Sequence, residues 1–545
     1  MPVFFNVTSH LWIAYLFFAN GLLINWVLRK RSNNYAELTK CFEAQVVAGF
    51  LISILMNGFL LFLLDVFNID FAKAIHMITA ISAIFIAYIA FCFRGAQFFS
   101  VEYSLYRIGL YIFVFIVLFY NGGLIEHVTD SWWHMSYANK IAHHNTLLLE
   151  VGHLDGVNKR DYPILWHANL ALLNALSDIH LPVIWNSFTA WGGVLKVMSY
   201  YLFAYALTGD RKVGLLSAIL FILLPGLHNS YLRLSSWPSH IAYMQLFAAL
   251  YVIFRLIDSI PNEASNLGTR LWSLVKNQTA YLLVLFSLFS LIFFTHLVEL
   301  VWLFIMLFAY SIALWSGRIW RELSPQVNER DLWSMNLFGW VAALILVLSS
   351  AKMFFHEMIF QKTNIDLLIS YGFPLLLGIV LLILAYFVTR QKRLTILKPL
   401  VLTMLAGLIL TVDFTQLVSL VYPIFDTRLQ LPNEQAFMTN GWFNSSLMLP
   451  SWNFQLRFGL LYSAVLSIPL SIYLAFRYTS RSTIFIAASS SIAFFFCVSP
   501  YFYHWLSYLL NYHSVWRVTI MIFHPLVFAI TVNLLFGKSL WKRAA

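Results

Sequence analysis

Long, nearly uninterrupted apolar runs recur along the whole chain. Leu11–Leu28 and Val46–Leu64 are the plainest in the N-terminal part, and others surround Leu282–Phe294 and Pro374–Val388. A helix of about 20 residues is needed to cross the roughly 30 Å of hydrocarbon in a bilayer. A transmembrane barrel would show alternating apolar and polar residues instead, so these runs predict helices. Only 10% of the residues are charged, against about 25% in a soluble protein, so we expect an all-α, polytopic membrane protein.

The apolar runs predict a transmembrane helical bundle of about 15 spans, plus or minus two. They centre near residues 20, 55, 84, 114, 194, 222, 248, 286, 308, 343, 379, 404, 466, 491 and 527. Two long outer loops interrupt them. The expected regions are N-terminal spans (1–124), an outer loop with two short interfacial helices (125–182), core spans (183–410), a second outer loop (411–456) and C-terminal spans (457–545).

Basic residues are sorted to one side of this topology. With the N-terminus outside, 23 of the 34 Lys and Arg residues fall in cytoplasmic loops together with 9 acids, which gives +14. Ten basic and 14 acidic residues fall outside, which gives −4, and Lys196 falls inside a predicted span. Lys and Arg resist translocation, so the sorting supports this orientation. The net charge of +11 is therefore topological and does not indicate a nucleic-acid partner.

Other features narrow the class. The three cysteines are too scattered for a disulfide framework or a zinc site. No small-residue cleavage site follows the first span, so it is predicted to be a retained helix. The cytoplasmic loops carry no P-loop glycine pattern, which argues against an ATP-driven pump. We expect a multi-pass protein of a bacterial inner membrane whose active site faces the periplasm, with the endoplasmic reticulum as the alternative.

The first outer loop holds an acidic and aromatic stretch that predicts a helix. Thr129 or Asp130 can cap its start. Trp133, Tyr137 and Ile141 then recur at four-residue spacing, an apolar stripe suited to lying on the membrane surface. Asp130 and His134 would share another face of the same helix. A second apolar helix is expected from Pro163 to Leu176.

The same stretch carries a family resemblance. D-S-W-W-H-M-S-Y-A (Asp130–Ala138) resembles the D-x-W-(F/W)-x-x-x-x-A stretch of oligosaccharyltransferase catalytic subunits, and more broadly the acidic first-loop motif of the GT-C glycosyltransferase superfamily. Four later segments are similar to others of that superfamily: Asp161–Ala168, Ser235–His240, Thr295–Glu299 and Trp516–Ile520. Three extra spans precede the motif loop, and W-W-D-x-G is absent, so the resemblance implies the superfamily and not an oligosaccharyltransferase.

The resemblance implies transfer of a sugar from a polyprenyl phosphate or diphosphate to a glycan, lipid or protein acceptor on the outer face. Inverting transfer needs a base at the acceptor and cations at the departing phosphate. Asp130 is the expected base, with simple helix capping as the alternative. Arg233 and Arg517, predicted at outer helix ends, would hold the phosphate, or else snorkel or pair with a nearby acid. Lys196, in the span Val183–Ala206, would bind the donor or form an internal pair.

Further candidates would line the cavity. They are Glu126, His134, Asp161, Tyr162, His240, His296 and Glu299, although His240, His296 and Glu299 could equally be interface residues. Seven of the 16 histidines lie in the first outer loop, but no H-x-x-x-H pair with a third ligand indicates zinc. A divalent cation (Mg or Mn) shared by Asp130 and a lipid diphosphate is the cofactor alternative. The second outer loop, near Trp442, would cover the acceptor.

Two other classes fit many of these features. A transporter or flippase of a lipid-linked glycan would also need many spans, but the sequence shows none of the repeats with matching broken helices expected there. An O-antigen polymerase or ligase would carry an arginine-rich outer loop, whereas residues 411–456 contain only Arg428. The membrane glycosyltransferase remains the leading prediction.

Overall fold

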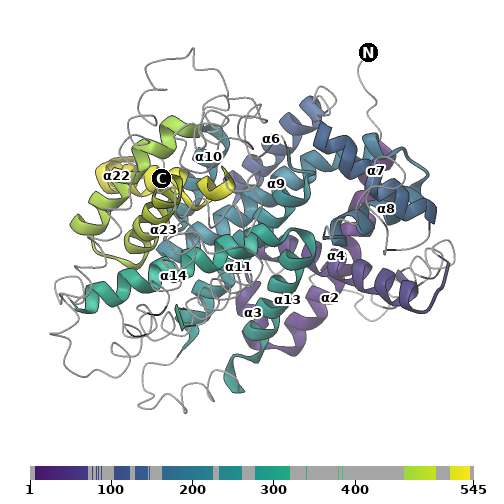
Figure 1. Ribbon diagram of the computed structural model, residues 1–545, viewed down its shortest axis with the longest axis horizontal. Helices are drawn as coiled ribbons and strands as arrows, with labels where there is room; N and C mark the ends of the chain where they lie inside the picture. Colours follow the sequence, from purple (N-terminus) through teal and green to yellow (C-terminus); the bar gives the residue numbers. More distant parts are fainter. Residues whose placement is uncertain are drawn as a thin grey trace, which may run out of the picture. The chain divides into compact units, whose positions relative to one another are not determined.

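Helices make up the described part of the chain, in which there is no strand (Figure 1). The computed structural model describes residues 7–70, 104–122, 129–144, 163–224, 234–260, 276–319, 460–498 and 516–540, with isolated positions between them. The chain divides into two units, Met1–Leu300 and Val301–Ala545, and each is described by itself.

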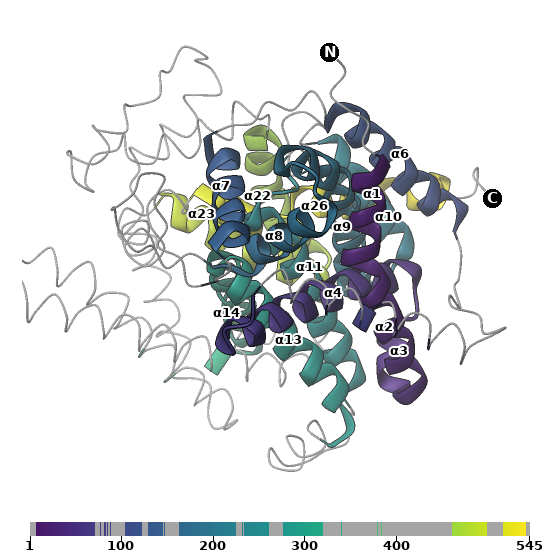
Figure 2. The same cartoon turned by 90° about the vertical axis from the view of Figure 1, so that its right-hand side faces the viewer.

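The first unit contains most of the described helices. They are α1 (Val7–Ala14), the π-helical turn η1 (Tyr15–Ala19), α2 (Asn20–Arg31), α3 (Asn33–Leu38), α4 (Phe42–Val66), α6 (Leu105–Gly122), α7 (Thr129–His144), α8 (Leu165–Ser177), α9 (Leu181–Thr208), α10 (Arg211–Leu223), α11 (Pro238–Ser259) and α13 (Thr279–Thr295). The start of α14 (Leu297–Ile319) also belongs to it. Helix α9 packs against α6, α10 and α11 and forms the centre of the unit, while α1 lies alongside it (Figure 2).

The second unit contains the rest of α14, then α22 (Leu460–Arg477), α23 (Arg481–Val498), the 3-10 helix η6 (Trp516–Met521) and α26 (His524–Leu540). Helix α22 packs on both α23 and α26. Phe485 of α23 lies between Tyr310 and Phe523, with ring centroids 5.4 and 5.8 Å away. Reciprocal hydrogen bonds between Ser480 and Thr483 satisfy backbone donors at the start of α23.

Four described helices are long and apolar enough to cross a membrane: Val7–Arg31, Phe42–Val66, Pro238–Ser259 and Leu297–Gly317. Shorter apolar helices include Leu105–Tyr120 and Thr279–Thr295. Eleven of the predicted spans overlap described helices, as expected of an integral membrane protein. The spans predicted near residues 84, 343, 379 and 404, like the loop 411–456, lie outside the described residues apart from isolated positions.

The central helix α9 has well-defined ends. Pro182 stands in its first turn, where a missing N–H costs no helical hydrogen bond. Gly209 ends it with φ of 70°, a conformation that a residue without a Cβ adopts at no steric cost. Its core face is aromatic: the Tyr200 ring stacks on Phe221 at 4.5 Å and meets Phe247 edge-on at 5.0 Å. These rings fix α9 against α10 and α11.

Small residues allow α2 and α4 to approach closely. A Cβ on Gly21 would lie 1.7 Å from the Gly49 carbonyl oxygen, so no larger residue fits there. The Gly21 amide donates to Ser53 Oγ at 2.9 Å, across the two helices. Close backbone contact of this kind is a common way to pack membrane helices, where burial of apolar surface gives no advantage over lipid.

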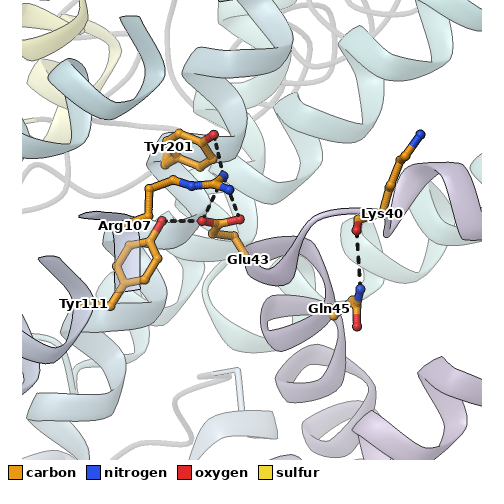
Figure 3. A network of polar contacts seen from close by, with 6 residues as sticks. All are labelled: Lys40, Glu43, Gln45, Arg107, Tyr111 and Tyr201. Atoms are coloured by element: carbon orange, nitrogen blue, oxygen red, sulfur yellow. Dashed lines mark hydrogen bonds and ion pairs between the residues drawn. The ribbon is translucent and has the colours of Figure 1, made fainter. Parts of the chain in front are cut away.

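A buried polar network joins α4, α6 and α9 (Figure 3). The Arg107 guanidinium lies 3.2 Å from the Glu43 carboxylate and donates to the Tyr201 hydroxyl at 2.7 Å. The Tyr111 hydroxyl donates to the same carboxylate at 2.9 Å. Glu43 is 1% and Arg107 7% exposed, so the charges lie out of water and are compensated by each other and by the two phenols.

Helix α8 lies deeper than the sequence predicts. Every residue from Leu165 to Leu173 is buried, and Asn169 Nδ2 donates to the Ile54 carbonyl at 3.1 Å. Ile54 precedes the end of α4 by 12 residues, or about 18 Å along the helix axis. The expected interfacial helix is therefore packed into the bundle, where Asn57 Nδ2 donates to Asn169 Oδ1 at 3.2 Å and so satisfies a buried polar group.

The apolar stripe of α7 also faces protein and not a membrane surface. Tyr137 and Ile141 are 4% and 1% exposed, and the Tyr137 ring lies 4.7 Å from that of His167 on α8. Figures 1 and 2 show α7 and α8 next to one another. Trp132, outside the stripe, is 52% exposed. The four-residue spacing correctly predicted an apolar face, but its partner is α8.

Candidate functional site

The first turn of α7 is tied to the start of α11. Helix α7 begins at Thr129, so Asp130 lies in its first turn and Ser131 follows in the same turn. Ser131, 3% exposed, accepts a hydrogen bond at 2.9 Å from the indole N–H of Trp237. Trp237 is the residue directly before Pro238, which begins α11. Residues separated by more than 100 positions therefore hold the turn that carries Asp130.

One helical turn after Asp130, His134 makes a buried contact with α8. Its Nδ1 lies 2.9 Å from Nε2 of His167, whose own Nδ1 lies 3.3 Å from the Pro163 carbonyl oxygen. A carbonyl oxygen only accepts, so His167 carries its proton on Nδ1 and accepts at Nε2. His134 is then the donor of the pair through its Nδ1–H. The tautomers of both imidazoles therefore follow from the one backbone carbonyl of Pro163.

Burial determines the protonation state of His167, the more deeply buried residue of this pair. His167 has no exposed surface, and burial lowers the pKa of its imidazole to about 3; the Pro163 carbonyl opposes that shift and the nearby His296 adds to it. Burial likewise raises the pKa of the adjoining Tyr137 phenol to about 12. Both groups are therefore neutral near pH 7 and act as fixed hydrogen-bonding groups.

Aromatic rings surround His134. Trp185 of α9 stacks on it with an interplanar angle of 18° and a centroid distance of 6.1 Å. Trp237 meets it edge-on at 6.2 Å, and Trp133 at 4.9 Å. Such contacts restrict the ring to one position and exclude water from it.

The candidate intramembrane lysine pairs with a candidate histidine. Lys196 of α9 is 1% exposed, and its Nζ lies 2.9 Å from Nδ1 of His240, in the first turn of α11. Trp237 again lies close, with its ring 6.2 Å from that of His240. A lysine amino group has at least two N–H donors, and His240 is its one hydrogen-bond partner among the described residues. The internal pair predicted as the alternative for Lys196 exists, and it leaves an N–H donor for a ligand.

His296 and Glu299 form a third pair at the junction of α13 and α14. His296 ends α13 and Glu299 lies in the first turn of α14, and Nδ1 of the histidine is in close contact with the Glu299 carboxylate. Glu299 is completely buried, and its Oε1 has no hydrogen-bond partner in the described structure. Both residues are therefore buried protein contacts in the interior of the first unit.

The structure thus brings five of the predicted candidates into the first unit's interior: His134, Lys196, His240, His296 and Glu299. His134, Lys196 and His240 are linked through Trp237. Arg517 lies in η6 of the second unit. Glu126, Asp161, Tyr162 and Arg233 lie outside the described residues.

Sequence reasoning missed the residues that connect the candidates. Ser131, His167 and Trp237 are separated by 36 and 70 positions, so no local spacing relates them. His167 lies in the histidine-rich loop 125–182 and in the segment Asp161–Ala168, and Trp237 lies in Ser235–His240, but neither signal indicates that these residues meet. Among the residues that the structure describes, no three His, Cys, Asp or Glu side chains are arranged to hold a metal ion.

The chain is only distantly similar to known proteins. No protein-family model matches the chain, and no curated protein matches it. Among solved structures, the archaeal oligosaccharyltransferase AglB from Archaeoglobus fulgidus, in complex with an inhibitory peptide and a dolichol-phosphate, is similar at a TM-score of 0.47 and 12% sequence identity. The match covers 81% of this chain and 52% of that one, so the chain spans about half the length of the archaeal protein.

Proposed function

We propose that the chain is a membrane glycosyltransferase of the GT-C type. It would transfer a sugar from a polyprenyl-phosphate or diphosphate donor to a glycan, lipid or protein acceptor at the outer face, in a bacterial inner membrane or the endoplasmic reticulum. The observation that carries the proposal is the packing of α7. The helix opened by the acidic motif is tied through Ser131 to the start of α11, and through the stacking of His134 on Trp185 to α9, the two helices that hold the buried Lys196–His240 pair.

In the proposed reaction Asp130 takes the proton of the acceptor hydroxyl as its oxygen attacks the anomeric carbon. The bond between that carbon and the phosphate oxygen breaks, and the electron pair leaves with the lipid phosphate. The proton thus ends on Asp130, and the new negative charge ends on the lipid phosphate.

Cationic groups would stabilise the departing phosphate. Among the residues whose side chains the structure describes, Lys196 is the proposed group. It is buried, and its amino group retains an N–H donor beyond the one directed to His240. Charge-assisted hydrogen bonds to phosphate are strongest where water is excluded. Arg233 and Arg517 remain the other proposed phosphate ligands, the loop near Trp442 the proposed acceptor cover, and a divalent cation shared by Asp130 and a diphosphate the proposed cofactor.

The first test replaces Asp130 by Asn, which keeps size and capping ability but removes basicity. Purified protein in detergent is incubated with a panel of polyprenyl-phosphate sugars and candidate acceptors, and released polyprenyl phosphate is measured by mass spectrometry. We expect Asp130→Asn to reduce the rate by about 100-fold or more, the usual contribution of a general base. An unchanged rate in a folded variant would show that Asp130 is not the base.

Asp178→Asn is the matched control. Asp178 caps the end of α8 in a left-handed conformation with φ of 53°, which asparagine also adopts readily. The same chemical change is therefore made on the neighbouring helix without disturbing the fold, and we expect normal turnover. If wild-type protein binds a polyprenyl-phosphate sugar tightly but releases no lipid phosphate with any acceptor, transport of the lipid-linked glycan becomes the better assignment.

A further inference from the structure

We propose that Trp237 is a positioning residue that locks the first turn of α7, and with it Asp130, onto the first turn of α11. Its effect on rate rests on the proposed function, whereas the coupling between the two turns can be measured without it. Trp237 touches both halves of the candidate site. Its N–H reaches Ser131, and its ring contacts His134 on one element and His240 on the other.

The backbone around Trp237 is fixed independently of α7. Its φ and ψ are −72° and 144°, the extended conformation that a following proline imposes. Its amide donates to the Leu234 carbonyl at 3.0 Å, and its carbonyl accepts from His240 and Ile241 at 2.9 and 3.0 Å. The indole therefore projects from a backbone that is held at both ends.

The preceding residues anchor the same segment to α8 and α9. The Ser236 carbonyl accepts from the Trp166 indole at 2.8 Å, and the Ser236 hydroxyl donates to the Trp185 carbonyl at 2.6 Å. A Cβ on Gly192 would lie 2.7 Å from the Ser235 carbonyl oxygen, so the segment lies directly on α9. With this anchor fixed, the Trp237–Ser131 bond ties the first turn of α7 directly to the start of α11.

A single hydrogen bond can matter at this position because proton transfer depends on short distances. A misplacement of about 1 Å can reduce an enzymatic rate by about 100-fold. Without the bond, the first turn of α7 would fray, because the backbone N–H groups at a helix start have no intrahelical acceptor and terminal turns open easily. The donor lipid would still bind at Lys196 and His240, so the loss belongs in kcat and not in KM.

The experiment compares Trp237→Phe, Ser131→Ala and the double variant with wild-type protein. Phenylalanine keeps an aromatic ring but removes the N–H, and alanine removes the acceptor. Trp191→Phe is the matched control, because the Trp191 indole also donates to a side chain, His10 Nδ1 at 3.0 Å, away from α7. Full-length protein in detergent is examined by hydrogen exchange at the amides of residues 133–135, which close the first turn of α7, and by donor kinetics.

We expect exchange at those amides to accelerate about fivefold in both single variants, and no further in the double variant. Turnover should fall about tenfold with the donor KM within about twofold, and Trp191→Phe should change neither quantity. Unchanged exchange in Trp237→Phe, or an equal effect of Trp191→Phe, overturns the positioning role. If exchange is faster in the two variants but the wild-type protein transfers no sugar, the positioning role of Trp237 is supported and only the proposed function is overturned.

Discussion

Lys196 combines nearly complete burial with His240 as its hydrogen-bond partner. A lysine that serves only to stabilise a bundle would be expected to face a carboxylate, since an isolated buried charge is costly. The described partner is instead an imidazole nitrogen, which accepts a hydrogen bond but supplies no negative charge. A buried amine either stays neutral or acquires an anionic partner, and the proposed function assigns that partner to a lipid phosphate.

Replacing Lys196 by Met separates binding from stability. Methionine has similar length and no charge, so we expect Tm in detergent to change by no more than about 3 °C. Affinity for polyprenyl phosphate, titrated with the purified protein, should fall about tenfold or more, since charged hydrogen bonds contribute about 1.5–3 kcal/mol.

Lys276→Met provides the comparison for that titration, because Lys276 is exposed at the start of the segment before α13. Its replacement should leave the affinity unchanged. Equal affinities of Lys196→Met and wild-type protein for polyprenyl phosphate would show that Lys196 has a structural role only.

At the scale of elements, the network of Glu43, Arg107, Tyr111 and Tyr201 is a buried polar link between α4, α6 and α9 (Figure 3). Glu43→Gln would remove the carboxylate that faces a buried guanidinium. Breaking a buried ion pair from one side costs about 3–5 kcal/mol. We therefore expect a clear fall in Tm, measured by thermal unfolding in detergent.

Glu37→Gln is the internal reference for that measurement. Glu37 lies 3.7 Å from Lys40, but both side chains are 61% exposed, and exposed pairs contribute at most about 1 kcal/mol. Adding Arg107→Met to Glu43→Gln should recover part of the loss, because no charge then remains buried. Similar Tm values for Glu43→Gln and Glu37→Gln would mean that the network does not stabilise the helix packing.

Elements differ in how well sequence predicts them. Continuous apolar runs require helix in a bilayer, which is why Phe42–Val66 and Pro238–Ser259 could be located from hydropathy alone. The depth of α8 could not, because it depends on Asn57 and Asn169 meeting across two helices. The π-helical turn at Tyr15–Ala19 is similar: the Leu16 carbonyl accepts from Asn57 at 3.3 Å, a contact that no periodicity shows.

In the candidate site, too, the sequence predicted the helices but not the contacts between them. The capping residue at its start and the stripe of Trp133, Tyr137 and Ile141 predicted the helix α7 that the structure contains, and the charge of Lys196 within an apolar run marked it as a residue of interest. Which residues they meet was not predictable. The Trp237–Ser131 and Lys196–His240 contacts depend on which helices are neighbours, a property of the tertiary packing.

At the scale of the whole molecule, the proposed chemistry depends on orientation in the membrane. The predicted topology places +14 on one side and −4 on the other and puts the N-terminal turn of α7 outside. A donor that carries its sugar on a polyprenyl phosphate at the outer face requires that arrangement. The placement of the candidate site at the outer face therefore rests on the sorting of charge along the whole chain.

Cysteine labelling in intact cells tests the orientation. In a chain whose Cys41, Cys92 and Cys497 are replaced by Ser, single cysteines are introduced at Glu37 and at His143, which are both exposed. A membrane-impermeant thiol reagent should label His143→Cys from outside, and Glu37→Cys only after the membrane is permeabilised, because translocation of the basic loop beside Glu37 is disfavoured. Labelling in the opposite order would place α7 in the cytoplasm, where Asp130 could not act on an acceptor at the outer face. Equal labelling of Glu37→Cys before and after permeabilisation, with His143→Cys also reactive, would contradict the predicted number of spans between the two positions.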